Sequence, residues 1–102
     1  MILNEERSMP YVTQPTRNLL DDKINELVDA LLEMDPKSVD GALNYTITSL
    51  MTRVYAQPYN YYNLNRANGV INSVRDEWYR RVVAPYEDQK AYENGDVYPS
   101  QQ

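Results

Sequence analysis

Apolar residues recur every three or four positions in three stretches of the chain, which is the spacing of one face of an α-helix. In the first stretch this face is formed by Leu20, Ile24, Leu27 and Leu31. We predict a helix over residues 14–33. Thr13 is placed to be its N-cap, and Pro15 falls in the first turn, where a missing N–H group costs nothing.

The opposite side of this first helix is acidic. Its carboxylates come from Asp21, Asp22, Glu26, Asp29 and Glu33. Pairs one turn apart, such as Glu26 and Asp29, occur in helical metal sites that are built from carboxylates. An acidic row opposite an apolar stripe is more often a solvated face, so we predict no metal site here.

The second apolar stretch follows a break at Pro36. We predict a helix over residues 41–55 with Asp40 as its N-cap. The apolar face consists of Leu43, Ile47, Leu50, Met51 and Val54. The β-branched run "YTIT" has the composition of a strand, but the helical spacing and the cap favour a helix.

The third stretch follows a loop that contains Pro58, and it predicts a helix over residues 61–84. Its apolar stripe lies within about 80° on a helical wheel. The stripe consists of Ala67, Ile71, Val74, Trp78 and Val82. We predict that Trp78 is the central large residue of this helix and packs against the first two helices. Gly69 costs about 1 kcal/mol inside a helix, so a close helix contact or a kink is expected there.

Pro85 cannot continue an α-helix without a kink or a restart. A short helix over residues 86–93 is therefore predicted, with Gly95 in a left-handed cap. The fold class is all-α: a small bundle of three main helices plus a short C-terminal helix after the proline kink. We divide the chain into an N-terminal arm (1–12), one helical domain (13–95) and a C-terminal tail (96–102).

The amino-acid composition excludes several kinds of functional site. The chain of 102 residues has no cysteine and no histidine, which removes disulfides, thiolate metal sites and the usual base at neutral pH. The net charge of −5 argues against general nucleic-acid binding. This charge is unevenly distributed, because residues 18–52 carry −5 and residues 53–90 carry +2. A cytoplasmic location without membrane insertion is expected, since neither a signal peptide nor a long apolar run is found.

Ten tyrosines stand beside no phenylalanine, which favours rings at a wet boundary such as a subunit interface or a ligand. A core this small gains from self-association, so we predict a homo-oligomer.

Three motifs resemble a family of small uncharacterised helical proteins met in phage and environmental genomes. They are "MPYV", "LNYTIT" and "EWYRRVVAPYEDQKAYENGDVY". The resemblance runs from Met9 to Tyr98, and the family begins at the position of Met9 and ends in "ENGDVY". It implies a helical fold and a phage-like setting. It implies no established activity, so no catalytic residue is carried over.

One flank of the third helix, beside its apolar stripe, carries polar and aromatic residues at helical spacing. Arginine and tyrosine one turn apart place a forked anion donor next to a stacking ring, and asparagines add amide donors and acceptors. The predicted ligand-binding residues are Asn68, Asn72, Arg75, Tyr79, Arg80 and Tyr86. Arg80 is expected to be solvent-exposed or to reach a neighbouring subunit. The same flank also suits a polar oligomer interface. On the other flank, Glu77 and Arg81 are predicted to form a surface pair.

These features favour a non-enzymatic phage-type binding protein that sequesters a small anionic, nucleotide-like ligand, such as a host defence signal, between subunits. Catalytic residues, cofactors and metals are not predicted. One alternative is a docking protein that binds a host or phage protein through a tyrosine-rich surface. A second alternative is an all-α nucleotide hydrolase that uses magnesium, with Glu26, Asp29 and Glu33 facing Glu77.

Overall fold

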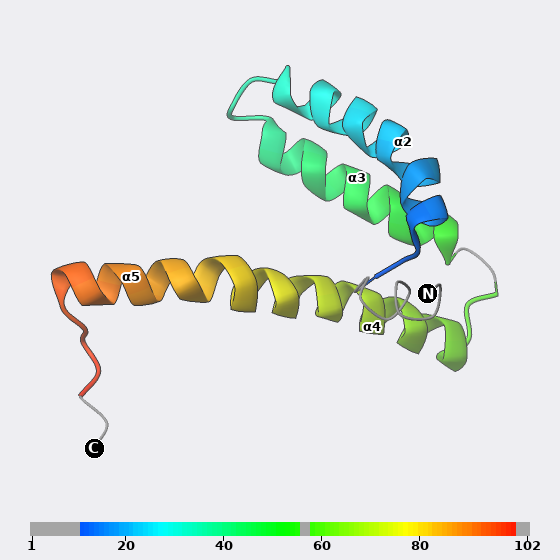
Figure 1. Cartoon of the computed structure of the whole chain (residues 1–102). Helices are drawn as coiled ribbons and strands as arrows, with labels where there is room; N and C mark the ends of the chain where they lie inside the picture. Colours follow the sequence, from blue (N-terminus) through cyan, green and yellow to red (C-terminus); the bar gives the residue numbers. More distant parts are fainter. Residues whose placement is uncertain (1–10, 56–57, 100–102) are drawn as a thin grey trace. The chain divides into compact units, whose positions relative to one another are not determined.

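The structure is a computed structural model that describes residues 11–55 and 58–99. All its elements within these ranges are helical (Figure 1), which confirms the all-α class. The elements are α2 (Gln14–Leu32), α3 (Val39–Val54), α4 (Tyr61–Trp78), a π-helical turn η1 (Tyr79–Val83) and α5 (Ala84–Asn94). Most of the predicted arm 1–12, part of the predicted loop at 56–57 and the last residues of the predicted tail lie outside the described residues.

The chain divides into two compact units, Met1–Leu50 and Met51–Gln102. The first unit holds α2 and most of α3. The second holds the end of α3, the long helix formed by α4, η1 and α5, and the C-terminal segment. The single bundle over residues 13–95 and its oligomeric state stay predictions.

Helix α2 begins as the sequence predicts. Thr13 is the N-cap, its carbonyl accepts the N–H of Arg17 at 3.0 Å, and Pro15 lies in the first turn. The Thr13 hydroxyl forms no capping bond to the backbone; it lies 3.3 Å from the hydroxyl of Thr16. The end at Leu32 agrees with the predicted end to within one residue.

The turn between α2 and α3 is organised by Asp35. Its Oδ1 accepts the N–H of Lys37 at 2.9 Å, and its carbonyl accepts the N–H of Ser38 at 2.8 Å. Helix α3 therefore starts at Val39, with the Ser38 carbonyl accepting from Ala42 at 3.0 Å. The prediction that Asp40 is the N-cap is wrong, because Asp40 lies inside the first turn. Its negative charge still favours the positive end of the helix dipole there.

Helix α4 begins at Tyr61, as predicted. Asn60 is its N-cap, and the side-chain oxygen of Asn60 accepts the N–H of Asn63 at 2.9 Å. Gly69 lies inside this helix. Among the described residues, nothing lies within 4 Å of the place where a Cβ would stand, so no close contact explains this glycine.

The helix continues through Pro85 by widening into a π-turn. The N–H of Ala84 donates to the carbonyl of Tyr79, five residues back, instead of the residue four back. A proline ring collides with the carbonyl four residues before it, which here belongs to Arg81, and the wider turn relieves this collision. The predicted kink is thus a π-turn, and α5 starts at Ala84 instead of Tyr86. Gly95 ends α5 with a positive φ of 91°, as predicted for a glycine cap, but its ψ of 151° differs from the predicted left-handed helical conformation.

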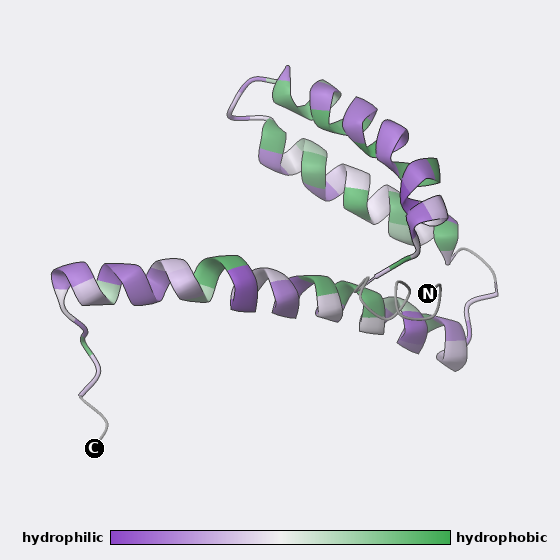
Figure 2. Ribbon diagram, in the orientation of Figure 1, coloured by the Kyte–Doolittle hydropathy of each residue, from purple (hydrophilic) through white to green (hydrophobic). Residues whose placement is uncertain are grey.

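Apolar residues recur along α2, α3 and the long helix (Figure 2). No side chain among the described residues is buried, however. Trp78 is 61% exposed, so its predicted burial in a core is not found. Each helix thus has apolar side chains that are exposed to solvent. Such exposed apolar surfaces are candidates for binding sites.

Candidate functional site

Two of the predicted ligand residues come together at the end of α4. Arg75 and Tyr79 line one surface hollow with Asp76, Trp78 and Val83. We call these five residues the Arg75 hollow. They belong to consecutive turns of α4 and η1, and helical spacing alone brings Arg75 and Tyr79 to the same side. Asn68 and Asn72 continue this side toward the start of α4, one and two turns before Arg75, and both are exposed.

Arg75 supplies the positive charge of the hollow. Within the described residues, no hydrogen bond or ion pair of its guanidinium group is found. Its five donors remain available to a bidentate acceptor such as a carboxylate or phosphate. The neighbouring carboxylate of Asp76 lines the same hollow and offsets this charge. The hollow therefore combines aromatic and apolar side chains with one positive and one negative charge.

Tyr79 is held by a hydrogen bond that the sequence pattern did not predict. Its hydroxyl donates to Oε1 of Glu87 at 3.0 Å. This hydrogen bond, together with the negative charge of Glu87, raises the pKa of Tyr79 above its ordinary value. The same hydrogen bond orients the Tyr79 ring, which lines the hollow together with Arg75.

The π-turn explains why Tyr79 meets Glu87 and not Tyr86. In a continuous α-helix, residues seven apart are rotated by only about 20° and residues eight apart by about 80°. The extra residue in η1 shifts this phase by one position, so that Glu87 comes into line with Tyr79. Tyr86 is turned away from the predicted flank. Its ring instead lies under the ammonium group of Lys90, with Nζ 5.6 Å from the ring centroid.

Arg80 is paired inside its own helix. Its guanidinium group donates to both carboxylate oxygens of Glu77, with the shortest distance 2.7 Å. The predicted pair of Glu77 with Arg81 is thus replaced by a pair with Arg80, three residues away instead of four. Both side chains are partly exposed, and pairs of this kind contribute little to stability.

A second aromatic group lies at the start of α4. The guanidinium carbon of Arg66 lies 5.7 Å from the ring centroid of Tyr55 and 5.4 Å from that of Tyr62. These distances are typical of cation–π contacts. Nη1 of Arg66 also donates to Oδ1 of Asn63 at 3.2 Å. Tyr59 and Tyr61 lie beside these residues in the sequence and are highly exposed, Tyr61 at 85%.

We call this group the tyrosine cluster; it consists of Tyr55, Tyr59, Tyr61, Tyr62 and Arg66. The sequence analysis predicted a tyrosine-rich surface but did not predict the contacts of Arg66 with Tyr55 and Tyr62. The spacing of four residues between Tyr62 and Arg66 is the signal that could have revealed the contact.

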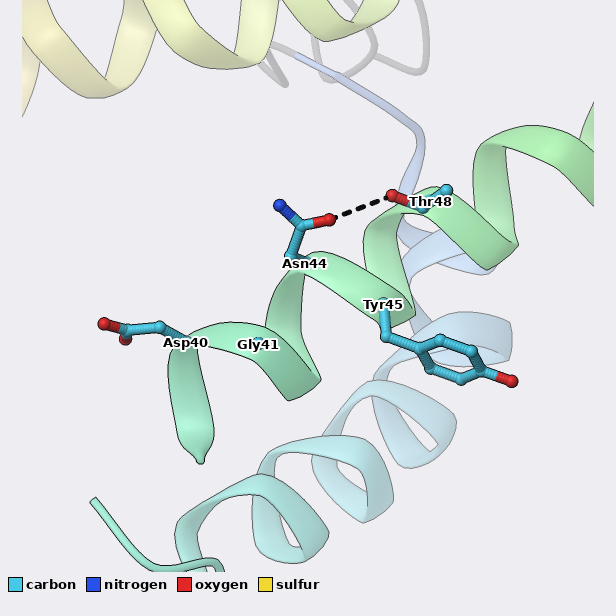
Figure 3. A pocket seen from close by; sticks show the side chains of 5 residues that line it. All are labelled: Asp40, Gly41, Asn44, Tyr45 and Thr48. Atoms are coloured by element: carbon cyan, nitrogen blue, oxygen red, sulfur yellow. Dashed lines mark hydrogen bonds between the residues drawn. The ribbon is translucent and has the colours of Figure 1, made fainter. Parts of the chain in front are cut away.

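A further hollow lies on α3 and is shown in Figure 3. It is lined by Asp40, Gly41, Asn44, Tyr45 and Thr48. The hydroxyl of Thr48 donates to Oδ1 of Asn44 at 3.2 Å, while the ring of Tyr45 and the carboxylate of Asp40 point in different directions. Because these groups do not converge on one point, the α3 hollow is a weaker candidate than the Arg75 hollow.

No group of three or more possible ligands that could hold a metal ion is found within residues 11–55 and 58–99. The acids of α2 are all exposed, as expected for a solvated face. None of the helices in the described part of the chain has the length and apolar content needed to cross a membrane.

A family model described as "Domain of unknown function (DUF6899)" matches residues 9–97. The chain belongs to this family. The match to DUF6899 begins at Met9, where the sequence motifs placed the start of the resemblance, and it covers most of each unit and the whole Arg75 hollow. Neither the curated proteins nor the solved structures contain a match to the chain.

Proposed function

We propose that this DUF6899 protein is a non-enzymatic, phage-type docking protein that binds another protein through its tyrosine cluster. The observation that carries this proposal is the exposure of Tyr59, Tyr61 and Tyr62 at the start of α4, where Arg66 lies over the rings of Tyr55 and Tyr62. Tyrosine and arginine are enriched at the centres of protein interfaces, because they bury much area and retain a polar end. The Arg66 contacts hold two rings of the cluster in place before binding, which lowers the entropy lost when a partner docks.

The charge of the Arg75 hollow and the exposed apolar side chains favour a docking protein over a binder of anionic ligands. A binder of anionic ligands is expected to enclose a positive cavity. The Arg75 hollow instead contains Asp76, and its tyrosine already donates to a carboxylate. The apolar and aromatic side chains left exposed on the helices are the expected signature of a protein that docks on other chains.

The test compares two tyrosines of similar exposure at opposite ends of the long helix. Tyr61 is 85% exposed in the cluster, and Tyr92 in α5 is 88% exposed. Tagged parent protein, Tyr61→Ala and Tyr92→Ala are used to capture proteins from the native host cells, and the captured proteins are quantified by mass spectrometry. We expect a partner that is lost with Tyr61→Ala and retained with Tyr92→Ala. Identical captures by all three proteins would overturn the proposal.

A second candidate is sequestration of a small anionic, nucleotide-like ligand in the Arg75 hollow. The specific observation in its favour is that Arg75, Trp78 and Tyr79 line one hollow, which places an unpaired guanidinium group beside two rings. Arginine recognises phosphate through a planar fork that lysine lacks, and base stacking on an aromatic ring contributes roughly 1–3 kcal/mol.

Calorimetric titration with linear and cyclic nucleotides tests this second candidate. Arg75→Lys and Tyr79→Ala are each expected to weaken binding while circular dichroism shows an intact helix. Absence of binding by the parent protein would leave the docking function alone.

A further inference from the structure

The long helix carries an apolar row that is longer than the one predicted from the sequence. Up to Trp78 its members are separated by alternating steps of three and four residues, which is the spacing of a coiled-coil seam. We call this row the apolar stripe; it consists of Leu64, Ala67, Ile71, Val74, Trp78, Val82 and Tyr86.

The π-turn keeps the stripe straight. A regular seam would step three residues from Trp78 to Arg81, which would place a charged group in the row. The extra residue of η1 moves Val82 into this position and brings Tyr86 into line behind it. The stripe therefore runs for roughly 33 Å along one side of the helix, at 1.5 Å per residue.

Most of the stripe is exposed to solvent: Val74 is 59% exposed, Trp78 is 61% exposed and Tyr86 is 63% exposed. Ala67 and Ile71 are half-buried. A helix with such a row normally buries it against another helix, because leaving several large apolar side chains in water is unfavourable.

The charges along the long helix indicate the charge distribution and orientation of a partner helix that would pack on the apolar stripe. Residues 61–83 carry four arginines against two acids, a net charge of +2. Residues 84–98 carry one lysine against four acids, a net charge of −3. Two copies that run in opposite directions place the basic part of each helix beside the acidic part of the other, whereas parallel copies place like charges together.

The helix dipole gives the same orientation. The first turn of α4 has no acidic residue and the last turn of α5 has no basic residue, so neither terminal turn carries a side-chain charge that compensates the helix dipole. An antiparallel neighbour sets the negative end of one helix beside the positive end of the other.

We propose that the apolar stripe is covered by a second copy of this chain, with the two long helices paired antiparallel. The occupant is inferred from the charge distribution of the helix, which complements itself only in this orientation. Helical spacing places Tyr62 and Arg66 of the tyrosine cluster on a different side of α4 from the apolar stripe, so self-pairing and docking are tested separately.

Light scattering on the purified parent chain gives the first test. We expect about twice the chain mass of 11.9 kDa at micromolar concentration. Val74→Glu places a charge in the stripe and is expected to give a monomer that remains helical by circular dichroism. Ser73→Glu places the same charge on the opposite side of the helix and should remain a dimer. A parent chain that is monomeric, or a Val74→Glu variant that is as dimeric as Ser73→Glu, would overturn the proposal.

A distance measurement on the assembled protein tests the orientation without a disruptive substitution. Because the sequence has no cysteine, Asn65→Cys supplies a single site for a spin label. Asn65 lies near one end of the stripe. In an antiparallel pair, two labels there are separated by about 30 Å along the axis, whereas a parallel pair places them roughly 10–15 Å apart across two adjacent helices. A short distance between the labels would contradict the antiparallel pair. A monomer mass without measurable dipolar coupling would also overturn the proposal. It would mean that a different chain, or the α2–α3 part of the same chain, covers the stripe.

Discussion

Tyr79 donates a hydrogen bond to Oε1 of Glu87, eight residues later in the same helix, at 3.0 Å. This contact exists because the π-turn contains one residue more than an α-helical turn, which rotates Glu87 onto the same side of the helix as Tyr79. It ties together the two sides of the turn, and it fixes the ring that lines the Arg75 hollow.

Replacing Glu87 by glutamine should lower the pKa of Tyr79 toward its ordinary value, since the hydrogen bond and the negative charge of Glu87 are what raise it. A group whose pKa is raised by folding contributes stability below its unfolded value, and this contribution is lost as the pH rises through the folded value. The difference in helix stability between the parent and Glu87→Gln should therefore be present at pH 7 and vanish once Tyr79 ionises.

Nuclear magnetic resonance titration of labelled tyrosine rings measures this pKa, with Tyr79→Phe identifying the signal. Glu93→Gln in the last turn of α5 is the matched control and should leave the pKa of Tyr79 unchanged. A Tyr79 signal that titrates identically in the parent and in Glu87→Gln would contradict the prediction.

Trp78 is the only tryptophan, so its fluorescence reports on the apolar stripe without labelling. In dilute solution we expect the emission of an exposed indole, because the side chain is 61% exposed in the single chain. As the protein concentration rises, the emission should shift to shorter wavelength when a second copy covers the ring. Val74→Glu should keep the long-wavelength emission at all concentrations, and a concentration-independent spectrum of the parent would speak against coverage by a second copy.

Replacing Pro85 by alanine restores an N–H group and removes the ring that collides with the Arg81 carbonyl. The turn is then expected to return to α-helical geometry. Glu87 would rotate away from Tyr79, and Tyr86 would leave the stripe. We expect an unchanged or higher helical signal, a Tyr79 pKa near its ordinary value and weaker self-association by light scattering. Retention of the raised pKa would show that the π-turn does not depend on the proline.

Replacing Asn60 by alanine removes the side-chain acceptor for the N–H of Asn63. The loss of an N-cap of this type typically costs about 1 kcal/mol. Thermal melting followed by circular dichroism measures the effect. Asn65→Ala, within the same helix but away from the cap, is the control and should not destabilise the protein. Equal melting of the two variants would mean that Asn60 is not a functioning cap.

The ends of the helices could largely be predicted from the sequence because their causes are local. Thr13 and Gly95 mark the start of α2 and the end of α5 through the backbone geometry of one or two residues. The N-cap prediction for Asp40 was wrong because an acid at the N-cap and an acid in the first turn both stabilise the start of a helix. The turn at Asp35 lets α3 begin at Val39, two residues earlier than predicted.

The site was harder to predict, because it depends on the phase of the helix after Pro85. A helical wheel with one fixed angle placed Tyr86 beside Tyr79, whereas the π-turn brings Glu87 there. The pairing of Glu77 with Arg80 instead of Arg81 was also not predicted, because partners three and four residues apart both lie on the same side of a helix. Burial of Trp78 was inferred from periodicity, which shows that a face is apolar but not what covers it.

The π-turn also has a consequence for the motions of the long helix. Pro85 has no amide hydrogen, so neither the Arg81 carbonyl four residues before it nor the Arg80 carbonyl five residues before it can receive a backbone bond from position 85. The helix therefore has fewer backbone hydrogen bonds at this point than elsewhere. Local opening starts where few hydrogen bonds must break. Amide hydrogens of η1 should therefore exchange with solvent faster than those in the middle of α4. We therefore expect local opening of the long helix to begin beside Tyr79 and Glu87, whose side chains meet across this turn.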